Sequence, residues 1–205
     1  MPFKIPKLSI ISTVDAKQKE DNGNLWNKNV ELNNDIYIYI EKNSEYKKTE
    51  TIKSVEIDNI KIITEPQKGG LEFYKPSTSE KNIYENIDEY KIENLIYDGD
   101  SKTNIKELKI SNQGGMFSFR ASNLNVGEYT SNDEELKYTE LLKKMDIKYD
   151  EISSKIGFDI TIVLQDGKKF KTNIELDIPV QEVIENGKGG KEITDLNLIF
   201  KRVEN

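Results

Sequence analysis

Aromatic side chains are the residues of this chain best suited by type and spacing to recognise a ligand. Tyr37 and Tyr39 alternate with isoleucines in the segment DIYIYI, and Trp26 lies in an otherwise polar segment. In a strand, these tyrosines would point away from the isoleucine face. Aromatic rings on the outside of a sheet can stack on sugars or anchor a protein partner. We therefore expect Trp26, Tyr37 and Tyr39 to form a ligand-binding surface, unless a second layer that includes the N-terminal arm covers them.

The residue types that most enzymes use for catalysis and metal binding are missing. The 205 residues include no His and no Cys, which removes the commonest general base, thiol nucleophiles and the usual zinc and iron–sulfur ligands. A Ser-x-x-Lys match at residues 44–47 lacks the companion motifs of the penicillin-recognising enzymes. We expect no catalytic residue, no metal site and no cofactor, so the sequence leans away from an enzyme.

Paired carboxylates are the catalytic set that the composition leaves open. The chain has 37 Asp and Glu, and glycoside hydrolysis needs only two of them at a fixed separation. The densest groups, Asp98 with Asp100 and residues 133–135, are interpreted as a solvated loop and a helix start. Residues 98–104 begin like a calcium loop, but Lys102 stands where a ligand is required. A carboxylate-based hydrolase acting on glycosides is therefore the alternative function.

Charge and hydropathy bear on partners and compartment. The formal charge is 30 − 37 = −7, and the lysines are dispersed among acidic neighbours. Because nucleic acids and anionic membranes attract a basic face, we expect neither as a partner. No stretch approaches the roughly 18 apolar residues of a membrane-spanning helix. The first residues lack the apolar core of a signal peptide, which predicts a cytoplasmic protein, or an extracytoplasmic one if a leader has been removed.

The elements that must position these side chains are mainly strands. Ala occurs only twice, while segments of period two recur from about Val30 onward. Period two is the spacing of a half-buried strand, and Ile, Val, Tyr and Thr favour strands. We predict an antiparallel β-sandwich that is loosely immunoglobulin-like, with a β-barrel as the alternative.

The longest alternating segments predict one hairpin with a defined register. A two-residue loop at Asp166-Gly167 would place apolar residues opposite charged ones, whereas a three-residue loop, 165–167, with Gly167 in the left-handed region keeps the apolar residues on one face. This register pairs Ile162 with Phe170 and Phe158 with Ile174. In another strand, the apolar positions change parity across Asp58-Asn59, which predicts a bulge or tight turn there.

Helical spacing is clearest near residues 133–145. An amphipathic helix is predicted there, with an inward stripe of Tyr138, Leu141, Leu142 and Met145. Residues 77–90 predict a second, short helix, and residues 196–200 predict the final strand. For domain organisation, we expect an N-terminal strand with a flexible polar arm over 1–29 and a single β-sandwich domain over 30–205.

These patterns favour a binding or structural role over catalysis. The sequence predicts a non-catalytic β-sandwich module, of a bacterial surface or phage-type assembly, that contacts a protein or carbohydrate partner. Fold alone does not confer function, so this expectation depends on the missing catalytic residue types and on the aromatic side chains.

Overall fold

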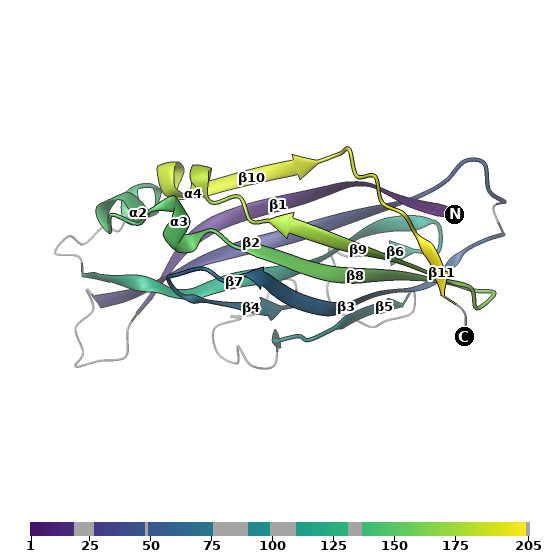
Figure 1. Ribbon diagram of the computed structural model, residues 1–205, viewed down its shortest axis with the longest axis horizontal. Coiled ribbons are helices and arrows are strands. Elements are labelled where there is room, and N and C mark those ends of the chain that lie inside the picture. Colours follow the sequence, from purple (N-terminus) through teal and green to yellow (C-terminus); the bar gives the residue numbers. More distant parts are fainter. Residues whose placement is uncertain (19–26, 48, 76–89, 99–109, 131–136, 204–205) are drawn as a thin grey trace.

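The computed structural model describes residues 1–18, 27–47, 49–75, 90–98, 110–130 and 137–203. Within these ranges the chain is built mainly of strands, with a few short helical segments (Figure 1). The strands are β1 (Phe3–Gln18), β2 (Asn27–Lys42), β3 (Ile52–Thr64), β4 (Gly70–Tyr74), β5 (Leu95–Asp98), β6 (Ile110–Ser111), β7 (Gly114–Thr130), β8 (Lys155–Leu164), β9 (Lys169–Asp177), β10 (Lys188–Ile193) and β11 (Lys201–Val203). The helical segments are η1 (Tyr138–Glu140), α2 (Leu141–Lys144), α3 (Tyr149–Ile152) and α4 (Gln181–Asn186).

The strands form two antiparallel sheets. Sheet A has the order β10-β1-β2-β7-β4, with β6 also paired to β7. Sheet B has the order β11-β9-β8-β3-β5. The two sheets pack face to face without closing on each other (Figure 1). The predicted antiparallel β-sandwich is therefore confirmed, and the barrel alternative is wrong.

Alternating apolar side chains from both sheets form the core between them. Ile36, Ile38 and Ile40 of β2 are buried, as period two in DIYIYI predicts. Across the interface between the sheets, the Phe119 and Phe158 rings pack edge to face with their centroids 5.1 Å apart. The Tyr97 hydroxyl of sheet B donates a hydrogen bond of 2.7 Å to the Ser118 carbonyl of sheet A. Apolar packing and this buried hydrogen bond thus join the two layers.

The hairpin register predicted from parity is confirmed. Ile162 pairs with Phe170 and Phe158 with Ile174, and Gly167 adopts φ +86° at the turn. The amide of Gly167 donates to the Leu164 carbonyl, and the amide of Leu164 donates to the Lys168 carbonyl. These bonds close the three-residue loop, and only a glycine takes this φ without strain.

The predicted bulge at Asp58-Asn59 is also confirmed. The pairing of β3 with β8 shifts register between Asp58 and Lys61, and Asn59 adopts φ +50°. The side-chain amide of Asn59 donates to Asp159 Oδ2 at 2.7 Å. The Lys171 ammonium lies 2.9 Å from the Asp58 carboxylate and 3.0 Å from the Asp159 carboxylate. Polar side chains of three neighbouring strands therefore hold the bulge.

The helix predicted near 133–145 is shorter and more irregular than expected. Residues 131–136 lie outside the described residues, and η1 and α2 contribute only one 3₁₀ turn and four α-helical residues. Leu141 and Leu142 are buried, whereas Tyr138 is 41% exposed. The extended backbone of Lys137 and the left-handed φ of +53° at Asp146 bound this segment. The backbone at Lys137 and at Asp146 therefore limits the helical segment, although the spacing of the apolar residues would fit a longer helix.

The C-terminal prediction is wrong in detail. Residues 194–200 belong to no strand, although Leu196, Leu198 and Phe200 pack against the core. This segment leads from β10 at the edge of sheet A to β11 at the edge of sheet B (Figure 1). Every second side chain is apolar because one side of this connection packs against the core, and not because the segment pairs with a strand.

Two other predictions fall partly or wholly outside the described residues. The short helix predicted at 77–90 coincides with the range 76–89, which is not described. Of the predicted polar arm, residues 19–26 are not described, while β1 continues to Gln18 and β2 begins at Asn27. The division of the chain at residue 29 stays a prediction.

Candidate functional site

The outward side of sheet A carries two of the three aromatic residues predicted to bind a ligand. Tyr37 and Tyr39 lie there, half-buried, while Trp26 falls outside the described residues. We call this surface the tyrosine face. It comprises the outward residues of β1, β2 and β10 around the tyrosines: Lys7, Ser9, Ile11, Thr13, Asp35, Tyr37, Tyr39, Gly190 and Glu192.

The surroundings of the two tyrosines differ. The Lys7 ammonium lies 4.6 Å from the centre of the Tyr39 ring and 2.8 Å from Glu192, so one side of this ring already receives a cation. Tyr37 lies between Ser9 of β1 and Ser118 of β7. Both rings are half-buried on this face of the sheet.

The apolar centre of the tyrosine face is Ile11, which is 49% exposed. It pairs across the sheet with Asp35 on one side and with Gly190 on the other. Because Gly190 has no side chain, one flank of Ile11 is open to solvent. An exposed β-branched side chain therefore lies on the same face as the two half-buried tyrosine rings, beside charged groups.

Polar side chains next to this patch are bound to one another. The Arg120 guanidinium donates two hydrogen bonds of 2.8 Å to the two oxygens of Asp35. The Ser122 hydroxyl donates to Asn33 Oδ1 at 2.6 Å, and Asn33 and Ser122 are both buried. Exposure on this side of the sheet thus decreases from β10 and β1 towards β7.

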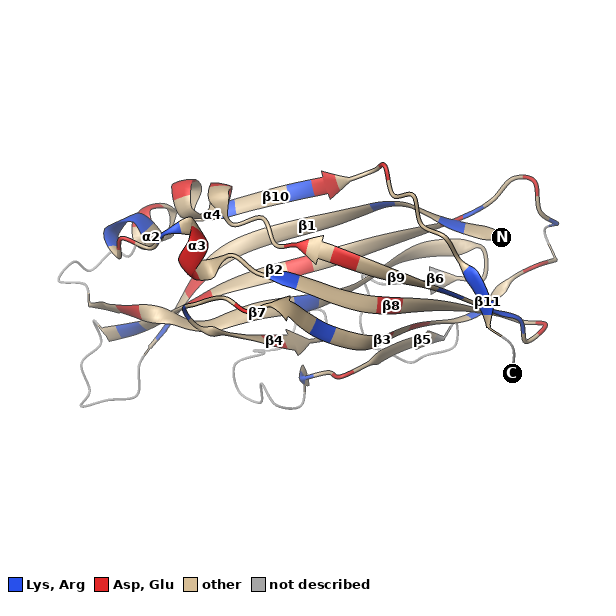
Figure 2. Ribbon diagram, in the orientation of Figure 1, with Lys and Arg blue, Asp and Glu red and all other residues tan. Residues whose placement is uncertain are grey.

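Several described carboxylates accept hydrogen bonds from basic or polar groups. Positive and negative side chains are interspersed along the strands (Figure 2). Hydrogen bonds from Lys155 and Lys91 hold the pKa values of Glu175 and Glu72 below the ordinary range. Burial alone would raise the pKa of Asp159, but hydrogen bonds from neighbouring side chains lower it overall. A general acid needs a raised pKa, so these three carboxyls are unsuited to that role.

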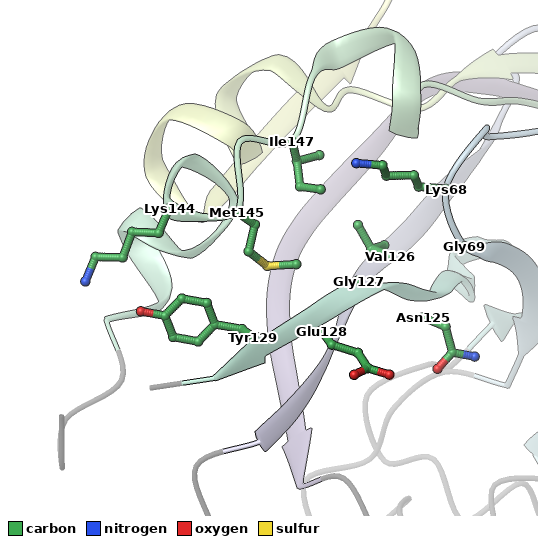
Figure 3. A pocket seen from close by; sticks show the side chains of 10 residues that line it. All are labelled: Lys68, Gly69, Asn125, Val126, Gly127, Glu128, Tyr129, Lys144, Met145 and Ile147. Atoms are coloured by element: carbon green, nitrogen blue, oxygen red, sulfur yellow. The ribbon is translucent and has the colours of Figure 1, made fainter. Parts of the chain in front are cut away.

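A second site lies at the helical end of the sandwich, where the ends of β2 and β7 meet α2 and the connection from β3 to β4 (Figure 3). We call it the end pocket, and its volume is about 430 Å³. Its apolar lining is Val126, Met145 and Ile147, with the backbone of Gly69 and Gly127. Its polar lining is Lys68, Asn125, Glu128, Tyr129 and Lys144.

Both lysines of the end pocket have carboxylate partners. The Lys68 ammonium lies 2.8 Å from Glu151, and the Lys144 ammonium lies 3.9 Å from Glu140. The hydrogen bond from Lys68, together with one from the Lys148 amide, holds the pKa of Glu151 below its ordinary range. The pocket is therefore polar but has no large excess of either charge.

The backbone around the end pocket is locally unusual. Gly69 and Asn125 line the pocket with φ values of +85° and +56°, and Asp146, between two lining residues, has φ +53°. Beside Gly69, the Asn123 amide donates to the Lys68 carbonyl at 3.1 Å, while its own buried Oδ1 has no hydrogen-bond partner. Left-handed non-glycine residues and unsatisfied buried oxygens are uncommon and destabilising.

Sequence reasoning did not find the end pocket. Its residues come from three separate parts of the chain, 68–69, 125–129 and 144–147, and no periodic pattern links them. The register shift between β2 and β7, where Val30 pairs with Gly127 but Leu32 with Asn123, places two extra residues in β7. The sequence NLNVG at 123–127, with two Asn and a Gly, was the available signal for that irregularity.

The described residues contain no group of three or more Asp and Glu placed to hold a metal ion. None of the helices in the described ranges is long and apolar enough to cross a membrane. No protein-family model, curated protein or solved structure matches the chain.

Proposed function

We propose that this protein is a non-catalytic β-sandwich module that binds a protein partner through its tyrosine face. The observation that carries the proposal is the exposed Ile11 beside the half-buried Tyr37 on the outside of sheet A. The assembly in which it would act, at a bacterial surface or in a phage-type structure, rests on the sequence prediction.

Two contacts favour a protein over a carbohydrate partner. Sugar binding commonly needs planar polar side chains that are available beside a ring. Here Asp35 and Arg120 bind each other through two hydrogen bonds, and Asn33 is buried against Ser122. An exposed isoleucine offers apolar area that a protein surface can cover, and Lys7 with Glu192 supplies a charged rim.

The alternative of a carboxylate-based hydrolase has no specific support in the described residues. Every described carboxyl whose pKa departs clearly from its ordinary range is shifted downward, by hydrogen bonds from lysines or from other polar groups. A retaining or inverting glycosidase needs one protonated carboxyl near neutral pH.

Site-specific photocrosslinking tests the proposal. A benzophenone amino acid is placed at Thr13, which is exposed on the tyrosine face, and, as a control, at Ile96, which is 57% exposed on sheet B. After irradiation of the source cells, we expect a discrete protein adduct from position 13 and none from position 96. Ile11→Asp should abolish that adduct, because a carboxylate would be buried against the partner.

Three results would contradict the proposal. Equal adducts from positions 13 and 96 would show non-specific contact, and no adduct from position 13 would leave the face without a partner. Binding of the purified chain to a glycan array that is lost in Tyr37→Ser would make the partner a carbohydrate. In each case the variant must first show the same thermal unfolding transition as the unchanged protein.

A further inference from the structure

The segment 194–203, which we call the strap, crosses from one sheet to the other. It leaves β10 at the edge of sheet A and ends in β11 at the edge of sheet B (Figure 1). Leu196, Leu198 and Phe200 pack against the core, but all three are only half-buried. Ile199, between the last two, is 76% exposed. The strap therefore covers part of the core while its other side faces solvent.

Few backbone contacts hold the strap in place. Within the described residues, the backbone of 194–200 makes one hydrogen bond, from the Leu198 amide to the Leu196 carbonyl, and this bond lies inside the strap. β11 adds three residue pairs, all with β9. One of them places Lys201 directly opposite Lys171, and like charges in that position destabilise the pairing of two strands. Apolar side chains are therefore the main attachment of the strap.

Detachment of the strap would leave the other strands paired. β10 stays bound to β1 and β9 to β8, whereas β11 pairs with β9 alone. Segments with few buried contacts open at a smaller cost in free energy than the whole domain does. The strap can therefore open as a unit, which uncovers apolar side chains of the core and leaves one edge of β9 unpaired.

We propose that the strap of a second copy of this chain fills the uncovered site, so that two copies exchange their straps reciprocally. A second strap carries the same apolar side chains at the same spacing, so it repeats every contact of the first. Exchange of an identical element needs no new interface, which makes it an accessible route to a dimer. Both copies keep β10 paired with β1, so the tyrosine face stays intact and the exchange does not depend on its function.

The exchange must depend on protein concentration. A short tether holds each strap near its own site at an effective concentration in the millimolar range, so a second copy competes when the chain itself is about millimolar. We expect the unchanged chain to be monomeric in dilute solution and to form a dimer as its concentration approaches about 1 mM. Small-angle X-ray scattering over a concentration series measures this change in mass.

Disulfide crosslinking between two single-cysteine variants of the full chain tests whether the strap is the element that exchanges. The chain has no cysteine of its own. Lys171→Cys and Lys201→Cys are mixed at about 1 mM and oxidised mildly. These residues lie opposite each other on β9 and β11, which is close enough for a disulfide. A disulfide between the two variants therefore traps a strap of one copy on β9 of the other.

A matched control separates exchange from random collision. Glu175→Cys also places an exposed cysteine on β9, but outside the residues that pair with β11. With Lys201→Cys as the common partner, we expect about tenfold more mixed disulfide from Lys171→Cys than from Glu175→Cys, because only position 171 is held next to position 201. If Lys171→Cys does not fold, Lys169→Cys with Val203→Cys, which are also opposite each other, replaces that pair.

A double variant, Lys171→Cys with Lys201→Cys in one chain, locks the strap. Oxidised in dilute solution, it should form the disulfide within one chain and stay monomeric at about 1 mM, whereas its reduced form should dimerise like the unchanged chain. Mixed disulfide specific to position 171 and loss of the dimer in the locked form support the exchange. Equal yields from positions 171 and 175, a dimer that persists in the locked form, or an unchanged chain that stays monomeric would each overturn it.

Discussion

Replacing Gly69 by Ala should destabilise the protein far more than replacing Gly167, although the two glycines share nearly the same backbone conformation. Their φ values are +85° and +86°. An added Cβ at Gly69 would lie 2.1 Å from Asn123 Oδ1 and 2.6 Å from the Leu124 carbonyl oxygen, whereas at Gly167 no atom lies within 4 Å. The pair therefore separates steric overlap from conformational preference.

Two contributions to the free energy of unfolding are common to both variants. Holding Ala at positive φ costs roughly 1–2 kcal/mol, and the lower entropy of the unfolded chain returns about 0.4–1 kcal/mol. Both terms apply equally, so Gly167→Ala should lose about 1 kcal/mol of unfolding free energy. Gly69→Ala should lose a further 1–3 kcal/mol or so, because the contacts at Gly69 cannot relax without moving the backbone of β7.

Urea denaturation measures both losses from the midpoint, provided that the slope stays constant. In an Asn123→Ala background the Gly69→Ala penalty should shrink but not vanish, since the Leu124 carbonyl oxygen remains 2.6 Å away. Equal losses in Gly69→Ala and Gly167→Ala would refute the close packing of Gly69 against β7.

Three more predictions concern polar contacts. Arg120→Met removes the two charged hydrogen bonds to the half-buried Asp35 and should lower the free energy of unfolding, measured by urea denaturation, by about 1.5–3 kcal/mol. As a control, Lys168→Met removes only an exposed ion pair with Asp166 and should leave the free energy of unfolding unchanged. Tyr97→Phe removes the hydrogen bond between the sheets and should cost about 1 kcal/mol; an unchanged thermal midpoint would contradict its role. For Asp159 the folded pKa lies below its ordinary value of 3.8, so its carboxylate stabilises the fold fully above that value and progressively less as the pH falls through the folded pKa. Asp159→Asn should therefore lower the melting temperature at pH values near 7. The difference in melting temperature between the variant and the unchanged protein should disappear in strong acid. A difference that stays constant with pH would contradict a stabilising role of the Asp159 charge.

The sandwich could be predicted because strand periodicity is a local property that a buried face enforces. In β8 and β9 a slip by one residue would turn Phe158 and Ile174 outward, so parity alone determined both the register and the three-residue loop. The bulge at Asp58-Asn59 followed from the same reasoning. These features depend on neighbours in sequence or on one adjacent strand.

The features that sequence reasoning missed depend on distant contacts. The spacing of Leu141 and Leu142 fitted a long helix, but both are buried from the four-residue helix α2, which ends before the turn at Asp146. Leu196 and Phe200 pack against the core from a connection between sheets. The end pocket combines three chain segments, and its residue types occur throughout a sequence that is rich in Lys, Asn and Glu.

The pairing of β1 with β10 has a consequence for synthesis on the ribosome. Leu8 pairs with Ile193 and Thr13 with Lys188, so one edge of β1 stays unpaired until residues 188–193 have been translated. Such distant partners make closure slow, and a nascent chain arrested before residue 188 should keep Phe3–Gln18 open to proteases and chaperones. Residues 8–13 therefore gain their second neighbouring strand only after about 175 further residues have been added to the chain.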